Sequence, residues 1–117
     1  MEKLINTTTL EIKKSKFIAY YYKIDNKEDV ENILNYLKKE HKKAKHMPYA
    51  YKINNIAKKS DDKEPSNTAG TPIYSVIERN NLDNTIILIV RYFGGIKLGT
   101  GLLTRCYLNC ALEVIKK

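Results

Sequence analysis

The chain has 117 residues, 43% of them hydrophobic, which is enough for one domain over residues 1–117 that folds without disulfides or a structural metal. Lys and Arg number 21 against 13 Asp and Glu, and the net charge of +8 favours polyanionic partners, above all nucleic acid. A genome-wide composition bias would also enrich lysine, so the charge alone does not choose between these explanations.

The sequence excludes a secreted disulfide scaffold. Its two cysteines, Cys106 and Cys110, lie close together in one helical pattern, where they cannot easily bridge each other, so small buried thiols are expected. No stretch is long enough to span a membrane, and residues 1–14 lack the apolar core of a signal peptide. We therefore expect a cytoplasmic protein without membrane contact.

Hydrophobic periodicity divides the chain into strands and helices. Asp25 or Asn26 is a candidate cap for the first helix, and Thr71 followed by Pro72 is typical of the start of the second. In chain order we expect strands at 7–13 and 17–24, a helix from 27 to about 41, a strand at 49–53, a long polar loop at 54–67, a helix from 71 to about 79, a strand at about 85–92 and a helix from about 99 to 115.

This order predicts an α+β fold: a two-layer sandwich with a four-stranded mixed sheet and helices on one face. The other face of the sheet would then be open or half-covered. Tyr20, Tyr22, Tyr49 and Tyr51 would offer stacking faces to nucleic-acid bases if they lay on that open face. The alternative is that half of each alternating set belongs to the core.

The stretch from Ile86 to Arg105 contains the first candidate site. A strand buried on both faces leads through a glycine-rich loop into a helix, whose first N–H groups and dipole favour anions. A sharp turn without a binding role would need the same glycines, so both interpretations stand. The expected anion- or nucleic-acid-binding residues are Arg91, Gly94, Gly95, Lys97, Gly99, Gly101 and Arg105, with Lys45 and His46 from the preceding lysine-rich segment.

The second candidate is the acidic loop that leads into the second helix. Its carboxylates would hold a hard metal such as Mg²⁺, or neutralise the basic residues of the glycine loop, or simply lie in a solvated loop that caps a helix. The sequence leaves these three alternatives open, and we assign no metal ligand. The loop residues of interest are Asp61, Asp62, Glu64, Ser66, Thr68 and Gly70.

Together these two stretches resemble the N-terminal domain of the IMPACT/YigZ family. The resemblance rests on DD-x-EPS-x-TAG-x-P from Asp61 to Pro72 and on RYFGGIKLG-x-G from Arg91 to Gly101, and it covers residues 10–117. It implies a ribosomal protein S5 domain 2-like fold and a role in translational regulation, without an established enzymatic reaction. Bacterial members usually add a second domain, so we expect a minimal member or a single domain.

The function that this resemblance implies is non-catalytic and associated with translation, with RNA or the ribosome as partner and no cofactor. One alternative is a Mg²⁺-dependent enzyme or a binder of a phosphorylated small molecule, in which Ser66 or His46 would supply acid–base or nucleophilic chemistry. Another is a protein–protein adaptor in translational control. The family often has glycine where this chain has Lys63, Asn67 and Leu102, and the bulkier Leu102 crowds the helix start where a phosphate would approach.

Overall fold

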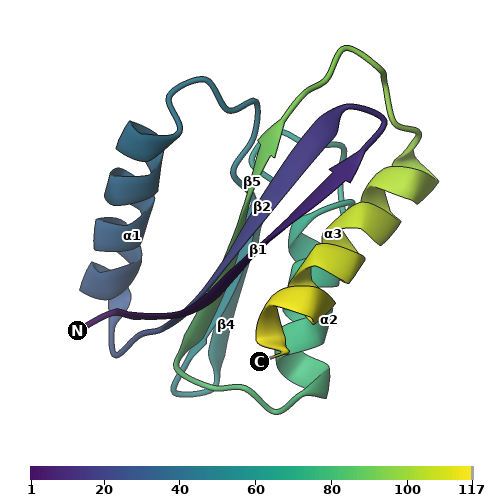
Figure 1. Cartoon of the computed structure of the whole chain (residues 1–117). Helices are drawn as coiled ribbons and strands as arrows, with labels where there is room; N and C mark the ends of the chain where they lie inside the picture. The colour runs from purple at the N-terminus through teal and green to yellow at the C-terminus, as the bar shows by residue number, and fades with distance from the viewer. Residues whose placement is uncertain (117) are drawn as a thin grey trace.

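A computed structural model describes residues 1–116 and shows one antiparallel sheet with three helices (Figure 1). The elements are β1 (Lys3–Ile12), β2 (Ser15–Lys23), α1 (Lys27–Glu40), β3 (Tyr49–Ile53), β4 (Ile56–Ser60), α2 (Gly70–Arg79), β5 (Thr85–Tyr92) and α3 (Thr100–Ile115). The α+β class is confirmed. The expected four-stranded mixed sheet is wrong, because there are five strands in the order β1-β2-β5-β3-β4 and every pair is antiparallel.

The additional strand, β4, lies inside the segment that was expected to be a long loop. It pairs with β3 through a two-residue turn in which Asn54 and Asn55 have φ of 50° and 66°. Asparagine tolerates this left-handed conformation, which suits the twist of a hairpin. β4 is an edge strand whose residues are mostly exposed, so it lacks the apolar alternation by which strands are detected.

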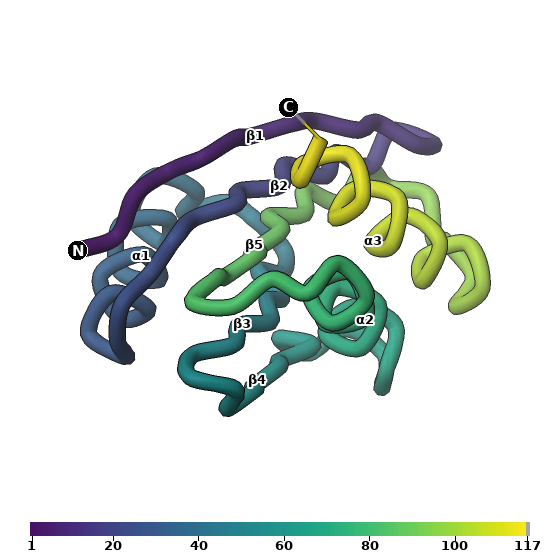
Figure 2. Tube along the Cα trace, turned by 90° about the horizontal axis from the view of Figure 1, so that it is seen from below, coloured from purple at the N-terminus to yellow at the C-terminus, as the bar shows by residue number. Residues whose placement is uncertain are grey.

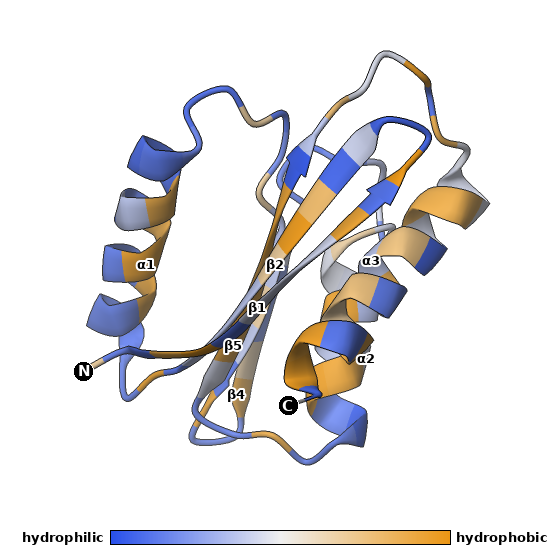
Figure 3. Ribbon diagram, viewed as in Figure 1, coloured by the Kyte–Doolittle hydropathy of each residue, from blue (hydrophilic) through white to orange (hydrophobic). Residues whose placement is uncertain are grey.

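The helices cover both faces of the sheet, so the expectation of helices on one face is also wrong. Figure 2 shows α1 on one side of the sheet and α2 with α3 on the other. Each side has its own buried cluster. In Figure 3 the hydrophobic face of α1 is turned toward the sheet and its charged face outward, as its helical periodicity requires.

The central strand β5 belongs to both clusters. Its residues Ile87 and Ile89 pack toward α2 and α3, whereas Ile86, Leu88 and Val90 pack toward α1, and all five are fully buried. A strand that alternates between two covered faces must be apolar at every position, which explains its uninterrupted apolar sequence.

The face that was expected to be open is therefore the one that α1 covers. Tyr22 and Tyr51 are buried in the α1 cluster, and Tyr20 and Tyr49 are partly buried against it, which favours the alternative that these tyrosines belong to the core. Tyr20 also shares His41 with Tyr92: the two tyrosine hydroxyls lie 2.7 and 2.6 Å from the two ring nitrogens of His41. These bonds fix the end of α1 on the sheet.

In residues 1–116 no helix combines the length and apolarity needed to cross a bilayer.

Candidate functional site

At the end of β5 an arginine and a glutamate form a buried ion pair. Arg91 Nη1 donates to both carboxylate oxygens of Glu64, at 2.9 and 2.7 Å. The side chains of Glu64 and Arg91 are only 2% and 7% exposed. Arg91 was expected among the anion-binding residues, and pairing with the acidic loop was the alternative; in the structure Glu64 from that loop neutralises it.

Two further side chains complete this buried group. Tyr107 on α3 donates its hydroxyl to Glu64, and burial, followed by the charge of Glu64, holds the pKa of Tyr107 far above its ordinary value. The hydroxyl therefore stays protonated and remains a donor. His46 lies with its Nε2 3.5 Å from Glu64 Oε1, and its Nδ1 is 2.8 Å from the backbone oxygen of Asp62.

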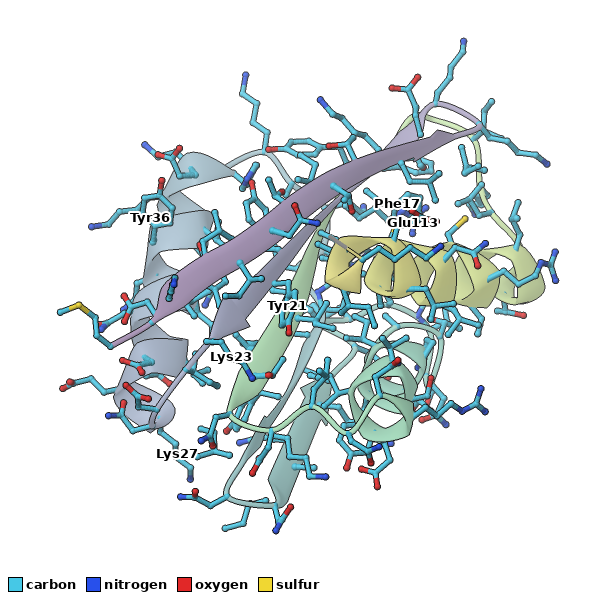
Figure 4. The ribbon with its side chains drawn as sticks, turned by 60° about the horizontal axis from the view of Figure 1, so that its bottom comes forward. Phe17, Tyr21, Lys23, Lys27, Tyr36 and Glu113 are labelled. Atoms are coloured by element: carbon cyan, nitrogen blue, oxygen red, sulfur yellow. The ribbon has the colours of Figure 1, made fainter. Side chains whose placement is uncertain are left out.

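Aromatic rings hold the guanidinium of Arg91 in place. Phe17 of β2 lies beside α3 (Figure 4), and its ring meets that of Tyr107 edge-on with centroids 5.2 Å apart. The guanidinium carbon lies 5.6 Å from the Phe17 centroid and 5.8 Å from that of Phe93. Arg91 Nε has no hydrogen-bond partner within residues 1–116. The pair is thus enclosed by β2, β5, α3 and the acidic loop.

The other two carboxylates of the acidic loop also make internal contacts. Asp61 accepts hydrogen bonds from the backbone N–H groups of Asn67, Ala69 and Gly70 at 2.9, 3.1 and 2.8 Å, and so caps the start of α2. Burial opposes ionisation of Asp61, but these three donors hold its pKa below the ordinary 3.8. Asp62 accepts from the backbone N–H of Met47 at 2.7 Å.

Of the three alternatives for the acidic loop, the geometry shows pairing with the glycine loop for Glu64 and helix capping for Asp61. All three carboxylates bind groups of the protein, and no group of three metal-ligating side chains occurs in the part of the chain that the structure describes. Thr68 donates its hydroxyl to the Pro65 carbonyl at 2.6 Å, while Ser66 is exposed. Gly70 lets the helix start approach Ser60, because a Cβ there would lie 3.1 Å from the Ser60 backbone.

A cavity of about 250 Å³ adjoins the ion pair. One part of its wall is apolar and contains Pro65, Phe93, Leu98 and Leu103. The other part is polar and contains Lys45, His46, Glu64, Arg91 and Lys97. Lys45 and Lys97 are exposed, so the cavity combines an apolar floor with two cations at its mouth. Such a lining suits an apolar or aromatic group that carries a negative charge.

The glycines of the loop have different roles. Gly94 lies against the β1–β2 turn, Gly95 has φ of +88°, and Gly99 and Gly101 stand at the open start of α3. The N-cap residue of α3 is Gly99, which has no side chain to cap the helix. Arg105 is exposed one turn further along, and its guanidinium would be 3.6 Å from a Cβ on Gly101. The structure thus brings Lys45, His46 and Lys97 together around the cavity and leaves Arg105 beside the helix start.

Sequence analysis missed two parts of this region. Tyr107 carries no motif that marks it as a partner of Glu64. Lys13 and Lys14 form the two-residue turn between β1 and β2 and lie against the glycine loop. No sequence signal marks the latter contact, because a tight turn fixes the register of β1 against β2 but not that of β2 against β5.

Comparison with known proteins identifies relatives over almost the whole chain. The model of the family "Impact N-terminal domain" matches residues 13–115. The IMPACT family member YvyE of Bacillus subtilis is 40% identical over 99 residues, which cover 82% of this chain and 46% of YvyE. An IMPACT family member of Haemophilus influenzae is 38% identical over 111 residues, which cover 91% of this chain and 54% of the relative. The chain thus spans about half the length of these relatives.

Two solved structures share the fold. A crystal structure described as that of a hypothetical protein superposes with a TM-score of 0.90 at 30% identity, over 99% of this chain and 61% of that chain. The structure of the two-domain translational regulator Yih1 superposes with a TM-score of 0.56 at 21% identity, over 96% of this chain and 46% of that chain. At that identity the second likeness concerns the fold alone.

Proposed function

Since the chain belongs to the family of Impact N-terminal domains, we propose that it is a non-catalytic regulatory domain of translation that binds RNA, free or on the ribosome. The family resemblance implies this role, and a protein of similar fold, Yih1, is a translational regulator. We propose further that residues 1–117 act as a single domain with the ribosomal protein S5 domain 2-like topology, and that its RNA site lies at the end of the molecule where β5 meets the start of α3.

One observation carries the proposal: the carboxylates of the acidic loop are engaged by groups of the protein itself, whereas the basic side chains around the cavity and the start of α3 are exposed. Asp61, Asp62 and Glu64 bind backbone N–H groups and the buried Arg91. Lys45, Lys97 and Arg105 are exposed and form no ion pair within residues 1–116. Exposed cations without local counter-charges bind phosphate groups with release of counterions.

The test is RNA binding as a function of salt. Fluorescence anisotropy with a labelled, unstructured RNA of about 20 nucleotides should show affinity that falls steeply between about 50 and 200 mM KCl, with each phosphate contact adding about 0.7 to the log–log slope. The triple variant Lys45→Glu, Lys97→Glu and Arg105→Glu should lose at least about tenfold in affinity, since three phosphate contacts become repulsive.

A matched control carries the same change of charge at the opposite end of the molecule. Lys3, Lys27 and Arg79 are exposed at the start of β1, the start of α1 and the end of α2, far from the glycine loop (Figure 1). Changing these three to glutamate alters the net charge equally and should lower affinity only slightly. Equal losses in both triple variants, or no binding at low salt, would contradict the proposed RNA site.

The cavity supports a second candidate, a phosphorylated small molecule. Its apolar wall and the two lysines at its mouth would suit a nucleoside monophosphate. Because the carboxylates of the acidic loop are already engaged, this binding should not need Mg²⁺. Isothermal titration with AMP, with and without Mg²⁺, tests this candidate: tight binding that Lys97→Glu abolishes would favour it over RNA.

A further inference from the structure

We infer that the tip of the β1–β2 hairpin, Lys13 and Lys14, forms with Phe93 a site for single-stranded RNA. In this site the lysines bind phosphates and the Phe93 ring stacks on a base. The inference rests on the proposed function and extends it from Lys45, Lys97 and Arg105 to Phe93 and to a hairpin tip that neither motif includes.

Strand register brings these residues together from distant parts of the chain. Lys16 of β2 is level with Tyr92 of β5, so the turn that precedes Lys16 reaches the residues that follow Tyr92. The contact is very close: a Cβ on Gly94 would lie 2.0 Å from the backbone oxygen of Lys14. The hairpin tip therefore rests directly on the glycine loop, next to Phe93.

The conformation of the tip is unfavourable for lysine. Lys13 and Lys14 have φ of 47° and 68°, in the left-handed region that favours glycine and asparagine. The two-residue turn of the β3–β4 hairpin, Asn54-Asn55, has nearly the same angles, 50° and 66°, and uses the residues suited to them. The strained pair of lysines thus lies at the end of the sheet next to the glycine loop, and the relaxed pair of asparagines lies at the opposite end.

The two lysines are available to a ligand. Both are exposed, and neither forms an ion pair in residues 1–116. The neighbouring Lys16, Lys97 and Arg105 are exposed as well. A tight turn and its contact with the glycine loop hold the backbone of the tip in place, so binding a phosphate there orders only the two side chains, which lowers the entropic cost.

Phe93 determines the kind of RNA that fits. Its ring is 44% exposed, whereas the other phenylalanine, Phe17, is fully buried. The guanidinium of Arg91 lies near the ring, so Phe93 is supported from within the protein. An exposed ring beside phosphate-binding cations is the usual platform for an unpaired base, and in a duplex the faces of the bases are hidden by stacking.

The experiment separates the lysines' charge from the geometry of the turn. The double variant Lys13→Asn and Lys14→Gly installs a sequence suited to the turn and removes two charges. It should raise the Tm by several degrees, weaken binding of an unstructured RNA at least about fivefold and lower the salt slope by about 1.4. The matched control Asn55→Gly, in the other turn, should raise the Tm and leave RNA affinity unchanged.

The proposed stacking of Phe93 on a base is tested with the same RNA and with a blunt-ended duplex of the same sequence. Phe93→Ala should weaken single-strand binding by about 5- to 100-fold, Phe93→Tyr should restore it, and neither should alter duplex binding. If the triple variant of Lys45, Lys97 and Arg105 loses binding but the tip and Phe93 variants do not, the inference is overturned and the proposed function stands. If the wild-type protein prefers the duplex or binds an acidic protein instead, the inference is overturned. If it binds no RNA, both fail.

Discussion

Glu64 and Arg91 meet at 2.7 Å in a place that is almost closed to water, although 27 residues separate them in the chain. The contact joins the acidic loop to the end of the central strand. It makes the two sequence motifs of this domain one structural unit, and it removes from the surface the cation that the glycine-loop pattern would otherwise offer to an anion.

The first prediction concerns this pair. Glu64→Ala leaves the buried guanidinium without a counter-charge and should lower the free energy of unfolding by about 3–5 kcal/mol. Urea denaturation followed by circular dichroism measures this. Replacing both residues, as Glu64→Leu with Arg91→Leu, should cost less, because no buried charge is left unpaired. The control is Glu113→Ala, whose ion pair with Lys116 is exposed and should contribute less than about 1 kcal/mol.

The second prediction concerns acid stability through Asp61. The pKa of Asp61 is lowered in the folded protein, so its stabilising contribution is present above the ordinary value of 3.8 and is lost as the pH falls through the lower folded pKa. Asp61→Asn should lower the free energy of unfolding by about 1–2 kcal/mol at pH 7. The difference between variant and wild type should shrink as the pH falls below 4. A constant difference from pH 7 to pH 2 would show that the charge of Asp61 is not responsible.

The third prediction compares two glycines of the same loop. Gly94→Ala places a methyl group against the Lys14 backbone, so the hairpin tip must move, and a loss of about 2 kcal/mol or more is expected. Gly101→Ala adds only an ordinary contact within α3 and should be neutral or stabilise by up to about 1 kcal/mol. Thermal unfolding of the two variants gives the comparison. Similar effects at both positions would argue against the tip contact.

The fourth prediction concerns the thiols. Burial, followed by the neighbouring Cys106 and Glu113, raises the pKa of Cys110 to about 12, and burial raises that of Cys106 as well. Neither thiol is a thiolate at pH 8, so the folded protein should react slowly with a disulfide reagent such as DTNB. In guanidinium chloride both thiols should react at once. Rapid labelling of the native protein would show that α3 opens readily from the sheet.

The helices and the central strand could be predicted from sequence because their patterns are strong. α1 and α3 show helical spacing of apolar residues, and β5 is an unbroken apolar run. What the pattern of α1 cannot tell is which face of the sheet it covers, since a hydrophobic side fits either. The evidence lay in β5: a strand buried on both faces requires cover on both, and one layer of helices cannot supply it.

The candidate site was predicted only in part. The spacing of the acidic and glycine motifs identified the right region, but a list of charged residues does not say which charges pair. Arg91 and Lys97 are equivalent cations in the sequence, yet one is enclosed with Glu64 and the other is exposed, because Arg91 belongs to a buried strand and Lys97 lies in a loop. β4 escaped prediction for a related reason, as an edge strand with exposed side chains has no apolar alternation.

The central place of β5 in the sheet also determines when the strands can pair during synthesis of the chain. β2 and β3 both pair with β5 and not with each other, so the two hairpins that precede it remain separate until most of the chain has been synthesised. Until then the inner edges of β2 and β3 expose unpaired backbone groups, which can pair with other chains. The late arrival of this one strand makes assembly depend on distant contacts, and such topologies fold slowly. The nascent chain is therefore most exposed to aggregation just before β5 leaves the ribosome.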